Sequence, residues 1–304
     1  MELYRSCQVL LLGAVLSSAA CVGQTTPAQS ELTVPSTATA SGNAVMDTAY
    51  CPAISASDSH LALVSKFCEF ARTYRHMLPD FIAQQTTSAR QGSSTNIVTA
   101  QVTFQRGQEH YSHVTINGRA APSNSLTSTP PKNIQLSSTG EFGSQLVDLF
   151  TSPGAVEFKF QEQSSLRGIP VAIYDFHVPS AKNTFWTLRD TTGRILKPEF
   201  RGQLWLELQT GRPLREELKP VNLPVSSGVA SLETVTDYSM ISVGDGGAFL
   251  LPVKSESTVC VEATASDLTG SLASDVHCTT NLLVFHDYRK FAATTRILDA
   301  SPEP

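Results

Sequence analysis

Short runs of alternating apolar and polar residues, separated by turns that carry glycine, occupy most of the sequence and limit the folds open to it. This period of two is typical of strands with one buried and one solvated face. Residues 96–104 and 110–117 form the first pair of runs, with a short turn around Gly107, and predict a hairpin. Turns this short indicate antiparallel strands, because parallel neighbours need crossovers of roughly a dozen residues.

The later runs continue this pattern as a meander. Gly244-Asp245-Gly246-Gly247 marks one turn between them. Asp287–Lys290, which is both charged and aromatic, fits a recognition patch and a turn between the last two strands equally well. Together the runs predict about ten or more strands in one large antiparallel sheet. The runs are 156–161, 171–178, 204–208, 214–218, 229–243, 249–254, 259–264, 278–285 and 290–297.

One amphipathic helix precedes the strands. Apolar residues recur at helical spacing from Ser59 to about His76, and Pro79 cannot continue that helix. The apolar segment Met77–Ile82 should pack where the helix packs. Residues 142–150 predict a second, short helix. The expected fold is therefore α+β and mainly β, with a sheet that curves around the helix.

Composition narrows the functional classes. The 304 residues are 41% hydrophobic, which suffices for a large core. The formal net charge is −5, and no cluster of Lys and Arg occurs. Proteins that bind nucleic acid depend on a basic surface. Because this chain shows none, we do not expect a nucleic-acid partner.

The N-terminus has the layout of a secretory signal peptide over residues 1–20. Arg5 precedes an apolar run at 9–16, which small residues and Cys21 follow. The run is too short to span a bilayer. Ser18-Ala19-Ala20-Cys21 is similar to a bacterial lipobox and would make Cys21 a lipidation site, although Ser18 stands where Leu is usual. Ordinary cleavage after Ala20 is the alternative.

The remaining domain organisation follows from composition. Residues 21–50, rich in Thr, Ser, Ala and Pro, predict a disordered tether. Residues 51–298 predict a single β-rich domain, and 299–304 a disordered tail. We expect an exported protein of the periplasm or cell envelope, anchored to a membrane if Cys21 carries lipid.

Four cysteines lie in the predicted domain: Cys51, Cys68, Cys260 and Cys278. An even number in an oxidising compartment predicts disulfides. Sequence proximity favours Cys51 with Cys68 and Cys260 with Cys278. A metal site is the weaker alternative, because no CxxC motif occurs.

The sequence carries no familiar catalytic arrangement. GxSxG, HExxH, GxGxxG and the phosphate-binding GxxxxGK[ST] are all absent. His110 and His113 would fall on opposite faces of a strand, which disfavours a shared ion. Asp175 and His177 would share a face, but no serine is marked beside them. We expect no catalytic residue, no metal and no cofactor.

The segment from Trp205 to Arg215, WLELQTGRPLR, resembles the strand–turn–strand motif of the LolA-like superfamily of bacterial envelope proteins. The superfamily includes the carrier LolA, the receptor LolB, lipid-binding mycobacterial lipoproteins and the RseB sensor domain. The resemblance implies a curved antiparallel half-barrel whose apolar concave face is covered by helices and holds acyl chains or a protein partner. Other segments, such as Leu78–Phe81 and Leu250–Val253, resemble exported bacterial proteins of unknown function.

Two functional hypotheses follow. The first is a non-catalytic binding protein that accommodates a lipid acyl chain, a lipoprotein or a protein segment on the concave face. The second is a solid-core interaction protein of the envelope; a secreted hydrolase around His110 or His177 is a more distant third. The candidate cavity residues of the first hypothesis are Phe142, Leu146, Phe150, Phe158, Phe160, Ile173 and Trp205.

Overall fold

The computed structural model describes residues 8–9, 51, 61–121, 142, 144–150, 156–183, 186–189, 194–262 and 276–291. Two helices and three 3₁₀ turns accompany the strands: α1 (Leu61–Met77), α2 (Ser144–Asp148), Ser180–Lys182, Val225–Ser227 and Gly244–Gly246. Three short strands form a small separate sheet: β1 (Gln8–Val9), β8 (Thr187–Arg189) and β9 (Ile195–Leu196).

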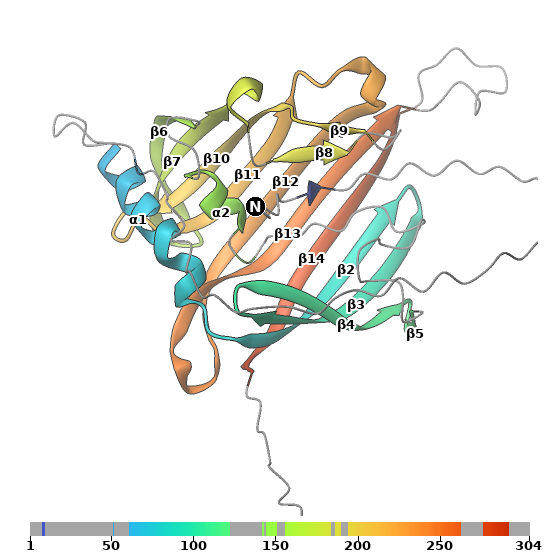
Figure 1. Ribbon diagram of the computed structural model, residues 1–304, viewed down its shortest axis with the longest axis horizontal. Coiled ribbons are helices and arrows are strands. Elements are labelled where there is room, and N and C mark those ends of the chain that lie inside the picture. Colours follow the sequence, from blue (N-terminus) through green and yellow to red (C-terminus); the bar gives the residue numbers. More distant parts are fainter. Residues whose placement is uncertain are drawn as a thin grey trace, which may run out of the picture.

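The main sheet is antiparallel, strongly curved and open (Figure 1). Its eleven strands are β2 (Phe81–Gln91), β3 (Ser94–Gln105), β4 (Gln108–Ile116), β5 (Arg119–Ala120), β6 (Glu157–Leu166), β7 (Ile169–Val178), β10 (Glu199–Glu207), β11 (Pro213–Val221), β12 (Val229–Ser242), β13 (Ala248–Glu262) and β14 (Val276–Lys290). Their order across the sheet is β5-β4-β3-β2-β14-β13-β12-β11-β10-β7-β6. The predicted mainly β fold with one long and one short helix is confirmed.

Several local expectations are also confirmed. The predicted first hairpin is β3–β4, and both residues of its turn have positive φ, 51° at Arg106 and 74° at Gly107. Such a turn matches the twist of the strands it joins. The Gly244–Gly247 turn connects β12 and β13. The predicted helices correspond to α1 and α2.

Strand boundaries differ from the expectation at two places. The runs 249–254 and 259–264 belong to the single strand β13, because Ser255 and Ser257 interrupt the apolar alternation without interrupting the ladder. Asp287–Lys290 is not a turn but the end of β14. A bulge there, with φ 54° at Asp287, shifts the register between His286 and Arg289. The rest of the expected last strand, 292–297, lies outside the described residues.

The pairing of β2 with β14 was not anticipated. The sequence predicts only an apolar segment after the helix at Phe81 and Ile82, yet these residues begin an eleven-residue strand. β2 pairs with the hairpin strand β3 on one side and with β14 on the other. This pairing joins the beginning and the end of the domain, which no local pattern reports.

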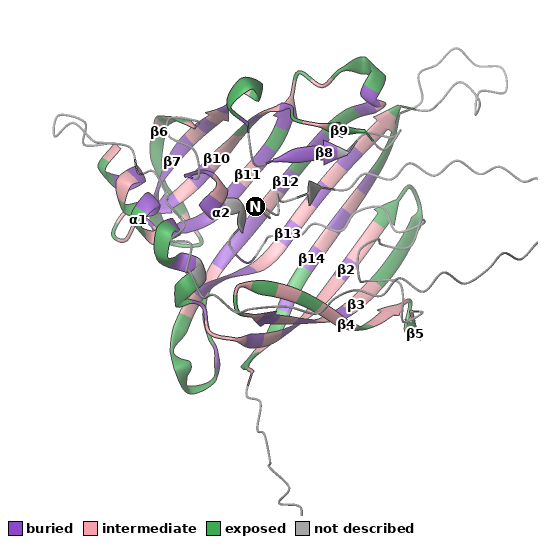
Figure 2. Ribbon diagram, viewed as in Figure 1, coloured by how far each residue is buried: buried purple, intermediate pink, exposed green. Residues whose placement is uncertain are grey.

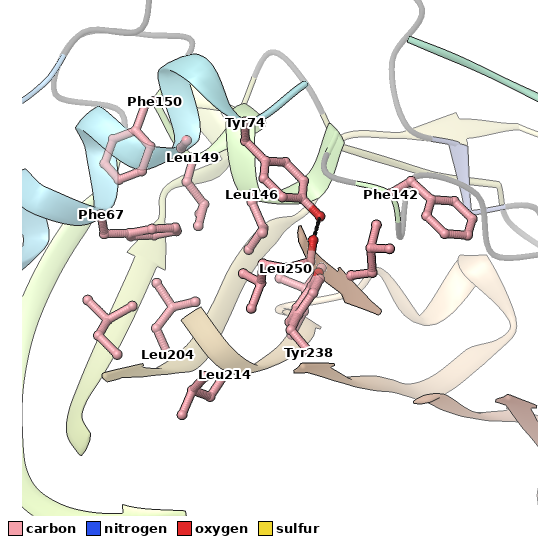
Figure 3. Close-up of a cluster of buried hydrophobic side chains, with 14 of the residues drawn as sticks. Phe67, Tyr74, Phe142, Leu146, Leu149, Phe150, Leu204, Leu214, Tyr238 and Leu250 are labelled. Atoms are coloured by element: carbon pink, nitrogen blue, oxygen red, sulfur yellow. Dashed lines mark hydrogen bonds between the residues drawn. The ribbon is translucent and has the colours of Figure 1, made fainter. Parts of the chain in front are cut away.

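Helices α1 and α2 pack on one face of the sheet, which we call the inner face. Buried residues lie both on the helices and on the strands (Figure 2), and their side chains form a continuous cluster between the two (Figure 3). Phe67 of α1 meets Phe150 edge to face, with ring centroids 5.0 Å apart. A smaller cluster places Leu188 of β8 against Val229, Leu232 and Val259.

Two disulfides are present, and they are the pairings that sequence proximity favoured. Cys51 bonds Cys68 of α1, and Cys260 of β13 bonds its cross-strand neighbour Cys278 of β14. Among the described helices, none is long and apolar enough to cross a membrane. The predicted signal peptide, the tether and Cys21 lie outside the described residues, apart from the two residues of β1.

Candidate ligand-binding face

The turn between β10 and β11 holds α1 in place over the inner face. Gly211 donates its backbone N–H to the Glu207 carbonyl at 2.8 Å, and its φ is 74°. A Cβ at Gly211 would lie 2.7 Å from the Cβ of Lys66 on α1. The Thr-Gly part of the motif therefore combines a left-handed turn with close approach to the helix.

Two aromatic side chains fix the helical layer farther along the sheet. The Tyr74 hydroxyl on α1 donates a hydrogen bond to the Leu250 carbonyl on β13 (Figure 3). Phe142, just before α2, packs between Phe81 and Phe285, with ring centroids 5.3 and 5.1 Å away. The two helices are thus attached to both halves of the curved sheet.

Five of the seven candidate cavity residues lie on this inner face. Phe142, Leu146 and Phe150 belong to the buried cluster. Phe158 stacks on Phe150, with ring centroids 5.9 Å apart, and Phe160 contacts Tyr174 edge to face at 5.7 Å. These side chains pack against one another and against the sheet, so they fill space beneath the helices.

Ile173 and Trp205 are not part of that group. They are cross-strand partners, and Trp205 also pairs with Arg215. They alternate with the buried Tyr174, Leu204 and Leu206 and so face the opposite side, the outer face. The Arg215 guanidinium lies 5.8 Å from the Trp205 ring and binds Asp237 through two hydrogen bonds of 2.8 and 3.2 Å.

The inner face carries a second feature that the sequence analysis missed. Beyond the apolar cluster, polar side chains with buried atoms replace the expected apolar ones on neighbouring strands. Two cross-strand rows contain most of them: Glu216–Thr236–Ser255 and Thr234–Ser257–Asn281. We call the following set the inner polar patch: Gln85, Thr87, Glu216, Thr234, Thr236, Ser255, Ser257 and Asn281.

Some members of the inner polar patch bond one another. The hydroxyls of Thr236 and Ser255 are 3.2 Å apart, and those of Thr234 and Ser257 are 3.0 Å apart. The Gln85 amide nitrogen donates to the Thr87 hydroxyl at 3.0 Å. These pairs explain how hydroxyl groups can be buried here at modest cost.

Other polar atoms of the patch have no partner. Both carboxyl oxygens of Glu216, both amide atoms of Asn281 and Oε1 of Gln85 are buried without a hydrogen bond in the described part of the chain. Burial, and secondarily the charge of Asp148, raises the pKa of Glu216 to about 8. Glu216 is therefore mostly protonated at neutral pH and can donate as well as accept.

A period-two pattern could have revealed this patch. On β12, Thr234 and Thr236 stand in phase with the buried Leu232. On β14, Asn281 stands in phase with the buried Leu283. Polar residues at positions that the alternation assigns to the core were the available signal.

No protein-family model and no curated protein sequence matches this chain. Solved structures with a similar arrangement include a LolA superfamily protein from Nitrosomonas europaea, at 11% identity, covering 77% of this chain and 94% of that one, with a TM-score of 0.35. A DUF1329 family protein from Desulfovibrio piger has 11% identity, covers 77% and 95%, and has a TM-score of 0.36.

A structure of the MucA–MucB complex of Pseudomonas aeruginosa has 12% identity, covers 76% of this chain and 100% of the matched one, and has a TM-score of 0.21. The LolA superfamily, whose motif residues Trp205–Arg215 resemble, is thus represented among the structures with a similar fold.

The outer face carries a groove of about 710 Å³ with a mixed charged lining. His177 lies in it between two carboxylates, 3.3 Å from Glu157 and 3.0 Å from Glu199. Asp175 instead accepts hydrogen bonds from Gln161 and Gln203, so Asp175 and His177 share a face without forming a pair. The two carboxylates thus lie on either side of the His177 ring.

The other histidines considered from the sequence lie apart from this groove, on β4. Glu109 accepts a hydrogen bond from the Tyr111 hydroxyl, and the His113 ring lies 3.2 Å from the Ser112 hydroxyl. Among the described residues, no group of three His, Cys, Asp or Glu side chains is placed to hold a metal ion.

Proposed function

We propose that this protein is a non-catalytic binding protein of the bacterial envelope that holds an amphipathic, lipid-like ligand on its inner face. One observation carries the proposal. The inner face combines a large apolar cluster with buried polar groups, and Glu216 and Asn281 among them lack partners in the described part of the chain. A ligand with an acyl chain and a polar end matches both surfaces.

The free-energy cost of burying polar groups without hydrogen bonds supports a ligand-binding role for this face. Each buried polar group left without a hydrogen bond costs about 1–3 kcal/mol. A protein that used this face only as a core would gain stability from apolar residues at these positions. Retaining several such groups on one face of the sheet is a cost that ligand binding would offset.

The proposed location rests on separate features. Disulfides persist in oxidising compartments, and the chain contains two. The N-terminal pattern predicts export, and Cys21 is the candidate lipid anchor. A hydrophobic ligand or an envelope protein is the expected partner.

A solid-core interaction protein is the second candidate. The packing of Phe142, Leu146 and Phe150 favours this candidate. These three side chains fill the space beneath the helices, where the acyl chain of a ligand would otherwise lie. In that case an envelope protein would bind elsewhere, at an edge strand or a loop, and no lipid-like ligand would bind.

Native mass spectrometry of the mature protein, purified from its own envelope, distinguishes the two candidates. We expect bound acyl species that are released on denaturation and identified by lipid extraction. A ligand-free mass, together with no uptake of fluorescent acyl probes whatever their head group, would instead establish the solid-core alternative.

A further inference from the structure

We infer that the inner polar patch recognises an uncharged, hydroxyl- or amide-bearing head group of the ligand. This inference rests on the proposed function and specifies its ligand class. The apolar cluster under α1 and α2 would contact the chain of the ligand, and the patch would contact its polar end.

The dimensions of the patch suit a head group. Its two rows cross β11 to β14, so with strands about 4.8 Å apart they are roughly 14 Å wide, and Gln85 and Thr87 of β2 extend the patch to roughly 19 Å. Successive inward residues along a strand are about 7 Å apart, which sets its height. Apolar side chains border it, among them Leu218, Leu232 and Leu283.

The patch offers both hydrogen-bond donors and hydrogen-bond acceptors that lack a partner. Asn281 offers two amide donors and a carbonyl acceptor, and Gln85 offers a second carbonyl oxygen. Glu216 in its neutral form adds one O–H donor and an acceptor oxygen. A hydroxyl or amide group on the ligand both donates and accepts hydrogen bonds. It can therefore pair with the donors and with the acceptors of the patch, whereas a group that only accepts or only donates can pair with one kind.

The charges around the patch disfavour an anionic head group. Glu216 lies in the patch and Asp148 lies close enough to influence it. The basic residues of β11 and β13 alternate with the patch residues and therefore point to the outer face; they are Arg215, Lys219 and Lys254. A carboxylate or phosphate would enter this site without a cation from these strands. Arg167, from the turn between β6 and β7, reaches the neighbouring carbonyls of Leu214 and Tyr238, and its guanidinium already donates hydrogen bonds to them.

A cationic head group is also disfavoured. It would ionise Glu216 and bury the resulting ion pair, and the removal of both charges from water offsets much of their attraction. The remaining patch residues offer hydroxyl and amide groups, and the second acid beside them, Asp148, already interacts with another group. An uncharged head group avoids this cost and still satisfies the unpartnered atoms of Asn281.

The test compares three amphiphiles with the same oleoyl-length chain: 1-monooleoylglycerol, oleate and oleylamine. We expect monooleoylglycerol to bind the full mature protein at least about tenfold more tightly than either charged ligand, the worth of one to two hydrogen bonds. Equal or tighter binding of oleate or oleylamine overturns the head-group inference alone. Binding of none of the three overturns the proposed function as well.

Variants of the patch test the residues themselves. Asn281→Leu should weaken monooleoylglycerol binding about tenfold, reduce its preference over oleate and raise the thermal unfolding midpoint, since it removes unpartnered buried groups. A lower midpoint with unchanged relative affinities would show that Asn281 is only structural and would overturn the inference.

A matched pair of double variants controls for indirect effects. Thr236→Val with Ser255→Ala removes a hydroxyl pair from the inner patch, and Thr258→Val with Thr280→Val removes the equivalent pair, 3.1 Å apart, from the outer face. Only the inner pair should lower the preference for monooleoylglycerol over oleate. Equal effects of both pairs would count against a site on the inner face.

Discussion

The hydroxyl of Tyr74 on α1 donates a 2.5 Å hydrogen bond to the backbone carbonyl of Leu250 on β13. The Tyr74 side chain is fully buried, and burial raises its pKa far above the ordinary range of a phenol. Tyr74 therefore remains a neutral donor at any physiological pH. The bond connects the long helix to the middle of the sheet.

Replacing Tyr74 by Phe tests this connection. Removal of the hydroxyl should lower the free energy of unfolding by about 1–3 kcal/mol, because a buried donor is lost while the ring remains. Urea denaturation measures the change. Tyr111→Phe is the control: its half-buried hydroxyl bonds Glu109, and its loss should cost less than about 1 kcal/mol. If the two substitutions lower the free energy of unfolding equally, the buried Tyr74 hydrogen bond stabilises the fold no more than the half-buried one of Tyr111.

The Gly211 turn yields a prediction about helix placement. Gly211→Ala combines an unfavourable positive φ with a Cβ only 2.7 Å from Lys66. Gly118→Ala separates the two effects, because Gly118 has a similar φ of 78° and a Cβ there would meet no atom within 4 Å. We expect about 1–2 kcal/mol of destabilisation at Gly118 and about 1–3 kcal/mol more at Gly211. Thermal unfolding of both variants measures the difference.

The local pattern was sufficient for most of the sheet. The β3–β4 hairpin follows from alternation on either side of Gly107, and β12 follows from a run that ends at the Gly244–Gly247 turn. Each depends on residues near one another in the sequence. The short turns also determined the antiparallel direction of the strands, because they leave no room for crossovers.

The features that escaped prediction depend on distant partners. β2 contains Gln85, Thr86 and Thr87 in its middle, and its place is determined by pairing with β14, almost 200 positions later. The inner polar patch is likewise assembled from five strands. The alternation on β12 and β14 places single polar residues in phase with the core, but only the pairing of the strands shows that these residues lie on one face together.

The position of Trp205 on the outer face predicts that it does not contact the ligand. Trp205→Ala should leave the affinity for monooleoylglycerol within about twofold of the wild type. It should lower stability by about 1–2 kcal/mol, through the lost cation–π contact with Arg215 and lost burial. Isothermal titration calorimetry measures the affinity without relying on tryptophan fluorescence, which the substitution changes.

Leu204→Ala is the comparison for Trp205, since Leu204 is the adjacent residue on the inner face and is fully buried. Its loss should cost about 2–5 kcal/mol and weaken ligand binding where the protein still folds. A folded Trp205→Ala protein that no longer binds the ligand would return Trp205 to the cavity wall that the sequence analysis proposed.

The buried carboxyl of Glu216 predicts an unusual dependence of stability on pH. Burial, and then the charge of Asp148, raises the pKa of Glu216 to about 8 in the folded protein, against an ordinary value of 4.5 when unfolded. Between these values the unfolded chain has released the proton that the folded protein retains. The contribution of Glu216 to stability is therefore fully present below pH 4.5 and is lost progressively up to about pH 8, by about 1.4 kcal/mol per pH unit.

Glu216→Gln should remove this contribution, because the amide does not titrate. The difference in unfolding free energy between variant and wild type should grow in favour of the variant from pH 5 to about pH 8 and then level off. Glu256→Gln provides the control, because the Glu256 side chain is partly exposed on the outer face of β13 beside Lys254. Urea titrations at closely spaced pH values measure all three proteins. A difference that stays constant across this range would mean that Glu216 is already ionised in the folded protein, and its neutral, donating form in the inner polar patch would have to be abandoned.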